Sequence, residues 1–517
     1  INLYGDYDVT SSDSLVVNRC VSVFPSYTYP AQATIFTGLF PKNHGITANF
    51  HFDRTGTSLA AKGKSENFSM FESLSFYTNE GSGNRMMNKG TKTIYDYLNE
   101  QYKCAVSSNL FVSQNQNAVN HVIGMFPWRL PWRFEGKDKS KIDWLIPNIY
   151  KQTQFITESA ADGIGDYRDN FDEEMMDDVI TYLKDFLEHK HPPPNLFTLY
   201  FGGHDHQAHI TVKSDRVAHP DIRAQRDYLK NTVDTQLGKF LKLWEKLIEQ
   251  NPILKNTLFV ICSDHGHTGA DWDDNKRITR KEVKKVLKYC GYDVLGKAEF
   301  GELESSCNCI TTITAASAQI HVRRAIFEYR SRGIKVDWTT SPDLKDLEEI
   351  MQEFSKANQG KSRENNFLSG AFDYILFKDY ERKTYQVYVF DTDRGSGNIK
   401  SINKNFGKEN GYILAKERLE EFYCENSGDI LLLINYKDHF RFEKRYRMKS
   451  THGSFLASDS YVPLIFSTPY DPGLIRKRTS GDYSKGIIPT AKIADITPTI
   501  LHQFNVPGER FDGKNLF

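Results

Sequence analysis

Four short polar segments, spread from residue 26 to residue 453, constrain the fold of this chain more than any other feature. They are residues 26–30 (SYTYP, followed by TGLFP at 37–41 and HG at 44–45), 205–209 (DHQAH), 263–266 (SDHG) and 451–453 (THG). Together they supply a hydroxyl nucleophile and enough carboxylates and imidazoles to hold two metal ions. A fold that uses them must bring all four segments to one place.

The spacing within two of these segments predicts metal ligands. Asp205 and His209 are four residues apart, so on one turn of helix both side chains face the same side and can share a cation. Asp264 and His265 directly follow the apolar run 257–262 (TLFVIC), which is typical of a buried parallel strand. Open α/β sheets bind their ligands at such strand ends.

The order of strand and helix patterns predicts an α/β fold with a mostly parallel central sheet flanked by helices. Helices are expected from residue 93, over 176–186 and over 229–244, and strands around 104–106, over 196–201 and over 257–262. The 196–201 strand would deliver Asp205. His452 is expected in a loop at a sheet edge, because the apolar run 462–466 follows it.

The chain divides into three parts by pattern. Residues 1–290 are predicted to form the first part of a catalytic core, 291–409 an inserted α+β region, and 410–517 the C-terminal part of the core. Within the insertion, the apolar runs 374–377 and 385–390 predict a β-hairpin. Residues 429–434 are expected to resume the core sheet.

Composition limits the partners. Lysine plus arginine and aspartate plus glutamate number 66 each, so charge gives no reason to expect nucleic acid or an anionic membrane surface as a partner. No apolar run approaches the length of a membrane-spanning helix. The seven cysteines are scattered and odd in number, so neither their pairing nor the compartment follows from the sequence.

The four segments, with ADITPTIL at 494–501 and DGK at 512–514, resemble the alkaline phosphatase superfamily and, within it, the type I phosphodiesterase/nucleotide pyrophosphatase family. The resemblance implies that Thr28 is the nucleophile and that Asn49 donates to a phosphoryl oxygen. It implies two Zn²⁺ per chain. One would be held by Asp205, His209 and His452, and the other by Asp264, His265 and Thr28.

One feature of that family has no match ahead of Thr28. Its members open with an apolar strand that ends in a metal-binding aspartate, a few tens of residues before the nucleophile. We expect this strand and its aspartate to be absent from the sequence, and the alternative is that Asp6 or Asp8 takes the role. Like Asp13, both look too close to Thr28. If neither holds, the second metal site is incomplete.

The resemblance implies a zinc-dependent phosphodiesterase or nucleotide pyrophosphatase that passes through a covalent phospho-threonine. Its partner would be a small phosphoester, either a nucleotide or a lipid headgroup, and its location secreted or periplasmic. The alternatives are a phosphomonoesterase or phosphonate hydrolase on the same scaffold, or a catalytically silent binding module if the first aspartate is truly missing. The sequence alone does not fix the oligomeric state.

Several polar and aromatic residues near the motifs are not assigned to the chemistry. We expect His44, His204, His206 and His267 to be supporting or loop histidines, because the matched residues already fill two tetrahedral sites once the missing aspartate is counted. The aromatic and basic residues of 126–134 could stack on a base or sugar, but packing onto the core is the more ordinary role for them.

Overall fold

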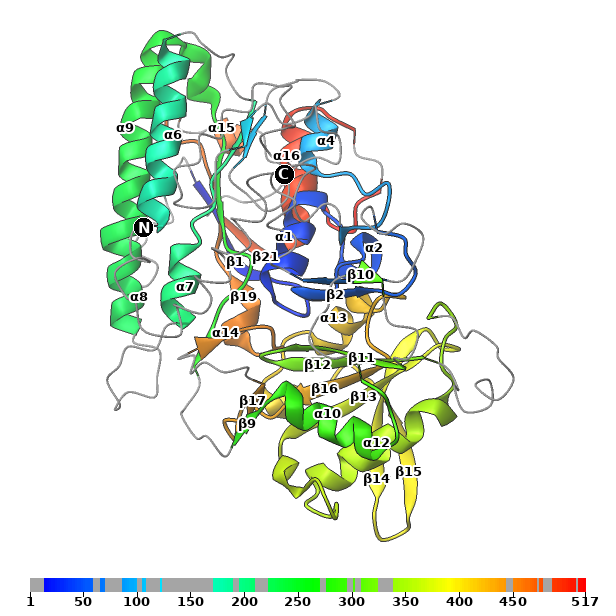
Figure 1. The fold of residues 1–517 in the computed structure, drawn as a ribbon. Helices are drawn as coiled ribbons and strands as arrows, with labels where there is room; N and C mark the ends of the chain where they lie inside the picture. The colour runs from blue at the N-terminus through cyan, green and yellow to red at the C-terminus, as the bar shows by residue number, and fades with distance from the viewer. Residues whose placement is uncertain are drawn as a thin grey trace.

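The computed structural model places helices on two main β-sheets, with the core sheet above and a second sheet below in the view of Figure 1. The described residues are 14–58, 66–69, 86–99, 105–107, 121–122, 171–188, 195–209, 222–269, 276–294, 301–302, 308–323, 338–442, 450–471, 474–477, 486–507 and 510–517. Within these ranges, no helix is both long and apolar enough to cross a membrane.

The core sheet is built around strand β1. Its strands are β1 (Ser14–Val21), β7 (Phe259–Cys262), β19 (Tyr461–Val462), β20 (Leu464–Ser467) and β21 (Ile487–Lys492). Strand β1 runs parallel to β21 and antiparallel to β19 and β20, and β7 pairs antiparallel with β20. Helices α1 (Thr28–Thr37) and α16 (Ile496–Gln503) share a buried apolar core with this sheet. Helix α1 therefore begins at the predicted nucleophile.

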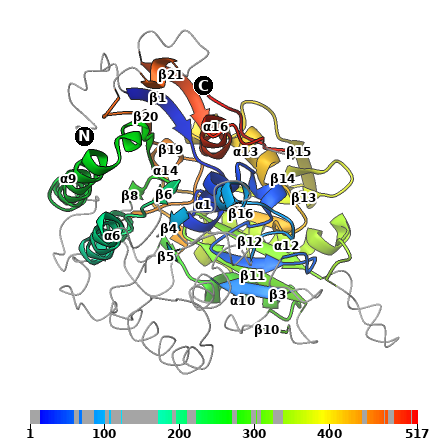
Figure 2. The ribbon, with the colours of Figure 1, turned by 90° about the horizontal axis from the view of Figure 1, so that it is seen from above.

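A smaller sheet of three strands is parallel throughout. It contains β4 (Ala105–Ser107), β5 (His121–Val122) and β6 (Leu196–Thr198). Helices α6 (Phe171–Leu187) and α9 (Asp234–Gln250) lie side by side in Figures 1 and 2 and pack with Phe197 of β6 and Phe259 of β7. The predicted helices and strands around these segments are confirmed, including α4 (Ile94–Asn99).

The sequence predicts a mostly parallel central sheet, whereas the described core sheet is mixed. The sequence predicts parallel neighbours for strand β7, but its described partner β20 is antiparallel. Three residues of β7 are half-buried and Cys262 is exposed. An apolar run of four residues packs equally well beside a parallel or an antiparallel neighbour, so its composition does not fix the direction of pairing. Among the described residues, no strand joins β6 to β7.

The second sheet has six strands, in the order β11-β12-β16-β13-β14-β15. They are β11 (Cys309–Thr314), β12 (Ser317–Val322), β13 (Phe372–Asp379), β14 (Thr384–Asp391), β15 (Ser396–Ser401) and β16 (Ile430–Ile434). Helices α10 (Arg280–Tyr289) and α12 (Leu344–Asn358) pack on one side, and α13 (Ala415–Phe422) on the other. The antiparallel pairing of β13 with β14 confirms the predicted hairpin.

Residues 429–434 do not return to the core sheet as the sequence predicts. Strand β16 lies in the middle of the second sheet, antiparallel to both β12 and β13. All five of its residues are buried, because apolar clusters cover both faces. A strand buried on both faces has no alternation of polar residues, so its sequence cannot show which of two sheets it joins.

The two sheets meet beside the start of helix α1. Phe24 stacks on Phe455, with ring centroids 4.0 Å apart, within an apolar cluster that includes strands of the second sheet. After the helix, Thr47 Oγ1 donates to the carbonyl of Asn426, and Gln319 Nε2 donates to the carbonyl of Thr47. The second sheet thus holds both the segment before the nucleophile and the segment that carries Asn49.

Candidate active site

The first group of site residues gathers three imidazoles around one carboxylate. Asp205 and His209 lie in helix α7 (Gly203–His209), with Asp205 Oδ1 3.4 Å from His209 Nε2. His452 Nε2 is 3.6 Å from the same oxygen and 3.1 Å from His209 Nε2. His267 Nε2 lies 2.7 Å from Asp205 Oδ1. One ligand atom from each of the four residues lies within 4.8 Å of the others, which makes this group a candidate metal centre.

Each of these imidazoles is anchored through its other nitrogen. His209 Nδ1 lies 2.9 Å from the carbonyl of Ser450, and His452 Nδ1 lies 3.0 Å from the carbonyl of Ser26. A carbonyl only accepts, so both Nδ1 atoms carry the proton and both Nε2 lone pairs face Asp205. Metal-binding histidines are oriented in this way.

Charge within the group favours an ionised Asp205. Burial opposes its ionisation, but His209 and His267 outweigh burial and hold the pKa of the carboxyl well below its ordinary value. Burial also lowers the pKa of His209, and Asp205 more than reverses this, so the pKa of His209 is raised. Burial, with His265 alongside, holds the pKa of His452 well below its ordinary value. The ionised Asp205 and the neutral His452 are thus in the forms that bind a cation, whereas a protonated His209 would release its proton on binding one.

A second group surrounds the predicted nucleophile. Thr28 Oγ1 lies 3.2 Å from His265 Nε2, and Asp264 Oδ2 lies 3.7 Å from the same nitrogen. Asp264 Oδ2 is buried and has no hydrogen-bond partner among the described residues. An isolated buried carboxylate oxygen is costly, so a cation at this point fits the group. The rings of His265 and His452 stack at 3.6 Å, which brings the two groups together.

Two glycines allow the site loops to approach their neighbours. Gly453 has φ of +108°, and a Cβ there would lie 2.1 Å from the ring of Tyr27. A Cβ on Gly266 would lie 2.0 Å from the carbonyl oxygen of Ser458. Both contacts are far inside van der Waals distance, so a larger residue would push His452 or His265 away from the nucleophile.

Asn49 lies at the start of the nucleophile helix, as its predicted role requires. Its Oδ1 accepts a hydrogen bond of 3.0 Å from the backbone N–H of Tyr29. This contact assigns the carbonyl side of the amide to the helix and leaves the NH₂ side to donate elsewhere. The backbone N–H of Thr28, at the N-terminus of α1, favours an anion at the same place, whereas Pro30 has no N–H and the N–H of Ala31 donates to the carbonyl of Tyr27.

The other unassigned histidines take different positions. His44 Nε2 lies 3.1 Å from Thr34 Oγ1 and its Nδ1 accepts from the N–H of Ile46, so it holds the turn after helix α1. His204 lies next to Asp205 but is outside the four-residue group. The side chain of His206 is outside the described residues. Asp6, Asp8, Asp13 and the 126–134 loop are outside them as well.

His267 is the functional candidate that sequence reasoning passed over. It was set aside because other residues filled the two tetrahedral sites, yet its ring lies among those of His209, His265 and His452. The available signal was its position two residues after His265, since alternate residues of an extended segment face the same side. Ser450, which contacts two of the rings, carried no signal at all.

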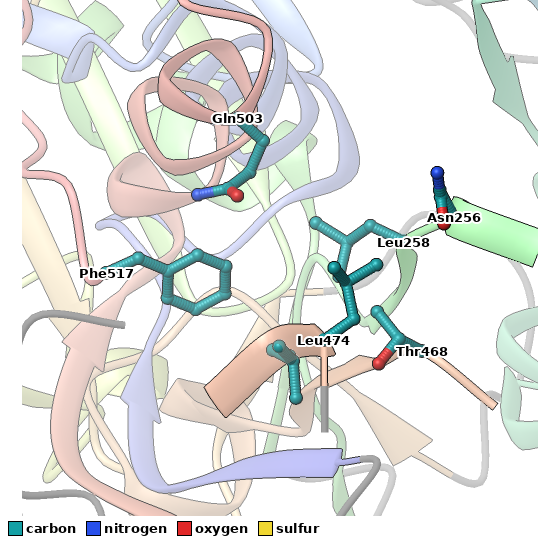
Figure 3. A pocket seen from close by; sticks show the side chains of 7 residues that line it. Asn256, Leu258, Thr468, Leu474, Gln503 and Phe517 are labelled. Atoms are coloured by element: carbon teal, nitrogen blue, oxygen red, sulfur yellow. The ribbon is translucent and has the colours of Figure 1, made fainter. Parts of the chain in front are cut away.

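The small pocket shown in Figure 3 lies apart from these groups. It opens between the C-terminal phenylalanine and the loops beside β7 and β20, and none of the candidate site residues lines it. Its lining residues are Asn256, Leu258, Thr468, Leu474, Ile475, Gln503 and Phe517. The lining is largely apolar and offers no cluster of metal-binding groups, so this pocket is not part of the candidate active site.

Comparison with known proteins identifies the family of this chain. The model of the type I phosphodiesterase/nucleotide pyrophosphatase family matches residues 11–307, and the chain belongs to this family. The matched range includes Thr28, Asn49, Asp205, His209, Asp264 and His265. No curated protein sequence matches the chain.

Solved structures of similar fold cover almost the whole chain. Murine ectonucleotide pyrophosphatase/phosphodiesterase 5 matches 97% of this chain and 90% of its own, with 15% identity and a TM-score of 0.50. The human counterpart matches 98% and 90%, with 14% identity and a TM-score of 0.51. An inactive variant of the murine protein, in complex with AMP, matches at 15% identity with a TM-score of 0.50. At this identity the likeness concerns the fold alone.

Proposed function

We propose that this chain is a zinc-dependent phosphodiesterase that uses Thr28 as a covalent nucleophile. The family membership supports hydrolysis of phosphoric diesters or pyrophosphates. The observation that carries the finer proposal is the position of Thr28 Oγ1, at the first residue of helix α1 and 3.2 Å from His265 Nε2. The hydroxyl thus belongs to the second candidate metal group, and the His265 ring beside it stacks on His452 of the first group.

The two groups would each hold one ion. Asp205, His209 and His452 would form the first site, and Asp264, His265 and Thr28 the second. Mixed carboxylate and imidazole ligands suit zinc better than magnesium, which prefers an all-oxygen shell. Bound zinc would supply Lewis-acid polarisation of the phosphoryl oxygens and lower the pKa of a ligating hydroxyl.

The side chains of this protein then divide the reaction between them. Thr28 Oγ attacks phosphorus and loses its proton, the bond from phosphorus to the leaving oxygen breaks, and the leaving group takes up a proton. Water next attacks the phosphorus of phospho-Thr28 and loses a proton, the bond from phosphorus to Thr28 Oγ breaks, and the phosphate product leaves as Thr28 Oγ takes up a proton. Asn49 Nδ2 and the backbone N–H of Thr28 donate to the non-bridging oxygens, where negative charge increases in the transition state.

The proposed site residues favour a diester over a monoester. They comprise two carboxylates, three imidazoles, one amide and one hydroxyl, and none is a lysine or arginine that would pair with the additional charge of a monoester. A nucleotide diester is the preferred substrate class, since a structural neighbour is described in complex with AMP. A lipid-headgroup diester and a phosphonate ester share the same reacting group.

Relative rates on two simple esters test this proposal. Zinc-loaded protein should cleave bis-p-nitrophenyl phosphate with a higher kcat/KM than p-nitrophenyl phosphate, because the ratio reports differential binding of the two transition states. A monoester preference of about tenfold or more would instead support the phosphomonoesterase. Protein that holds two zinc ions but cleaves neither ester would support a silent binding module, and so would protein that holds none after zinc-replete purification.

A further inference from the structure

We propose that His267 is a fourth protein ligand of the first metal ion, together with Asp205, His209 and His452. This inference rests on the metal dependence proposed above and concerns one residue that the family resemblance does not assign. It changes the character of the first site, because three protein ligands leave a zinc ion one open position and four close its shell.

Four of the six distances between the ligand atoms are close to those of a tetrahedral shell. Zinc bonds of about 2.0–2.1 Å place neighbouring ligand atoms of a tetrahedron about 3.3 Å apart. Asp205 Oδ1 lies 2.7 Å from His267 Nε2, 3.4 Å from His209 Nε2 and 3.6 Å from His452 Nε2. His209 Nε2 and His452 Nε2 are 3.1 Å apart. These four distances lie around the tetrahedral value. The two remaining distances, from the ligand atom of His267 to those of His209 and His452, are at most 4.8 Å.

The hydrogen bonds of Ser450 fix the orientation of His267. Ser450 Oγ donates its single proton to the carbonyl of Ala208 at 2.6 Å. The hydroxyl must therefore accept at its other contact, the 3.1 Å approach of His267 Nδ1. Nδ1 then carries the proton, and the Nε2 lone pair faces Asp205. His209 and His452 are arranged in the same way, so all three imidazoles present Nε2 to one point.

A competing role for His267 is a hydrogen bond to Asp205 with no bond to the metal. The 2.7 Å separation suits a hydrogen bond, but Nδ1 already donates to Ser450, so the ring would need a proton on each nitrogen. Such a cation would lie with its ring centroid 4.8 Å from that of His209 and 5.0 Å from that of His452. If His267 is instead neutral, its lone pair faces a carboxylate oxygen, and a cation between the two atoms relieves their repulsion.

Closure of the shell has a consequence for the chemistry. A first ion with four protein ligands has no free position for substrate until its coordination rises to five or His267 moves. The open position would then belong to the second group, where only Thr28, Asp264 and His265 are proposed as ligands. The first ion would mainly fix helix α7 and the His452 loop next to Thr28.

Zinc K-edge X-ray absorption tests the assignment directly. The double variant Asp264→Ala/His265→Ala should keep only the first ion, and its spectrum should fit three imidazole ligands. His267→Ala in that background should reduce the fit to two imidazoles. His204→Ala is the matched control, because this histidine borders Asp205 but lies outside the group, and it should leave three. A spectrum of the double variant that fits only two imidazole ligands, with His267 still in place, would overturn the inference.

Protein without the double substitution provides a second measurement if that variant does not fold. With both ions bound, an average of about two imidazoles per zinc supports His267 as a ligand, and about 1.5 contradicts it. Metal analysis separates this inference from the proposed function. Protein without zinc defeats both, whereas zinc-loaded, diester-cleaving protein with two imidazoles at the first ion defeats only the role of His267.

Discussion

The two candidate metal groups are built to different degrees of completeness. In the first, three imidazoles and Asp205 converge, and every ring is held through Nδ1 by a backbone carbonyl or by Ser450. In the second, Asp264 and His265 have only the Thr28 hydroxyl beside them, and Asp264 Oδ2 has no hydrogen-bond partner among the described residues. The first group has the arrangement of a preorganised cation site, whereas the second leaves a buried carboxylate oxygen that a cation would stabilise.

Under the proposed function, this difference would give the two groups different roles. A rigid cluster suits an ion that positions the loops, and an incompletely surrounded ion suits contact with a reacting group. The stacked rings of His265 and His452 connect the two groups, so displacement of either ring would disturb the ligand positions in both groups. The comparison can be tested by substituting first the nucleophile Thr28, then the ligands of each group, and then Asn49.

Removal of the nucleophile should have the largest effect. Thr28→Ala should lower kcat for diester cleavage by about 10⁴-fold or more, because it removes the attacking oxygen, while leaving the fold and most bound zinc intact. Ser26→Ala is the control, since Ser26 Oγ donates to the carbonyl of Ser454 at 3.2 Å and does not face the metal groups. Activity lost in Ser26→Ala but kept in Thr28→Ala would show that the nucleophile is misassigned.

Removal of ligands should empty the groups separately. His209→Ala or His452→Ala should release the first zinc, and Asp264→Ala or His265→Ala the second, each with a loss in kcat/KM of about 10²-fold or more, because the groups act as a unit. Metal analysis after dialysis gives the number of zinc ions bound per chain. His206→Ala should keep most of its zinc. Loss of zinc in His206→Ala, with retention in His209→Ala, would mean that the ligand pair of helix α7 was misread.

Substitution of Asn49 should have a smaller effect that spares the metals. Asn49→Ala should lower kcat by about 10²- to 10³-fold through loss of one donor to the transition state, with KM and zinc content little changed. Asn49→Asp keeps an oxygen that can accept from the Tyr29 N–H, but it removes the donor and adds a negative charge, so it should be at least as inactive as Asn49→Ala. An active Asn49→Asp variant would show that capping of helix α1, not donation, is the function of this residue.

Much of the site was predictable because its segments carry local signals. The i,i+4 pair of helix α7, the Asp264-His265 pair after β7 and His452 before an apolar strand can each be read from short stretches of sequence. Their convergence followed from the family resemblance, and the structure brings them together. The bonding role of each residue stays a prediction.

What the sequence did not predict depends on contacts between distant segments. His267 meets Asp205 across 62 positions, and the contact depends on how the loop after β7 folds back toward helix α7. The sheet that β16 joins and the direction of β7 were also missed, because a uniformly apolar strand fits more than one neighbour. Pairing of strands is decided by the whole fold, whereas ligand spacing is decided locally.

The smallest expected effect concerns histidines of the scaffold, outside both metal groups. Burial lowers the pKa of His44 to about 3 and that of His51 to about 4, against an ordinary value near 6.5. Below pH 6.5 the unfolded chain takes up protons at these residues and the folded chain does not. The free energy of unfolding should therefore fall as pH decreases from 6.5 toward 4, by about 1.4 kcal/mol per pH unit for each histidine.

The variant His44→Gln isolates this contribution from that of the metal ligands. In chelator-treated protein, urea unfolding at several pH values between 4 and 6.5 should show a shallower pH dependence for His44→Gln than for wild type, by about 1.4 kcal/mol per pH unit. The variant is expected to lose stability overall, since His44 accepts from Ile46 N and donates to Thr34 Oγ1, so only the slope is diagnostic. Parallel slopes would mean that His44 titrates normally and that the acid sensitivity lies in the metal groups themselves.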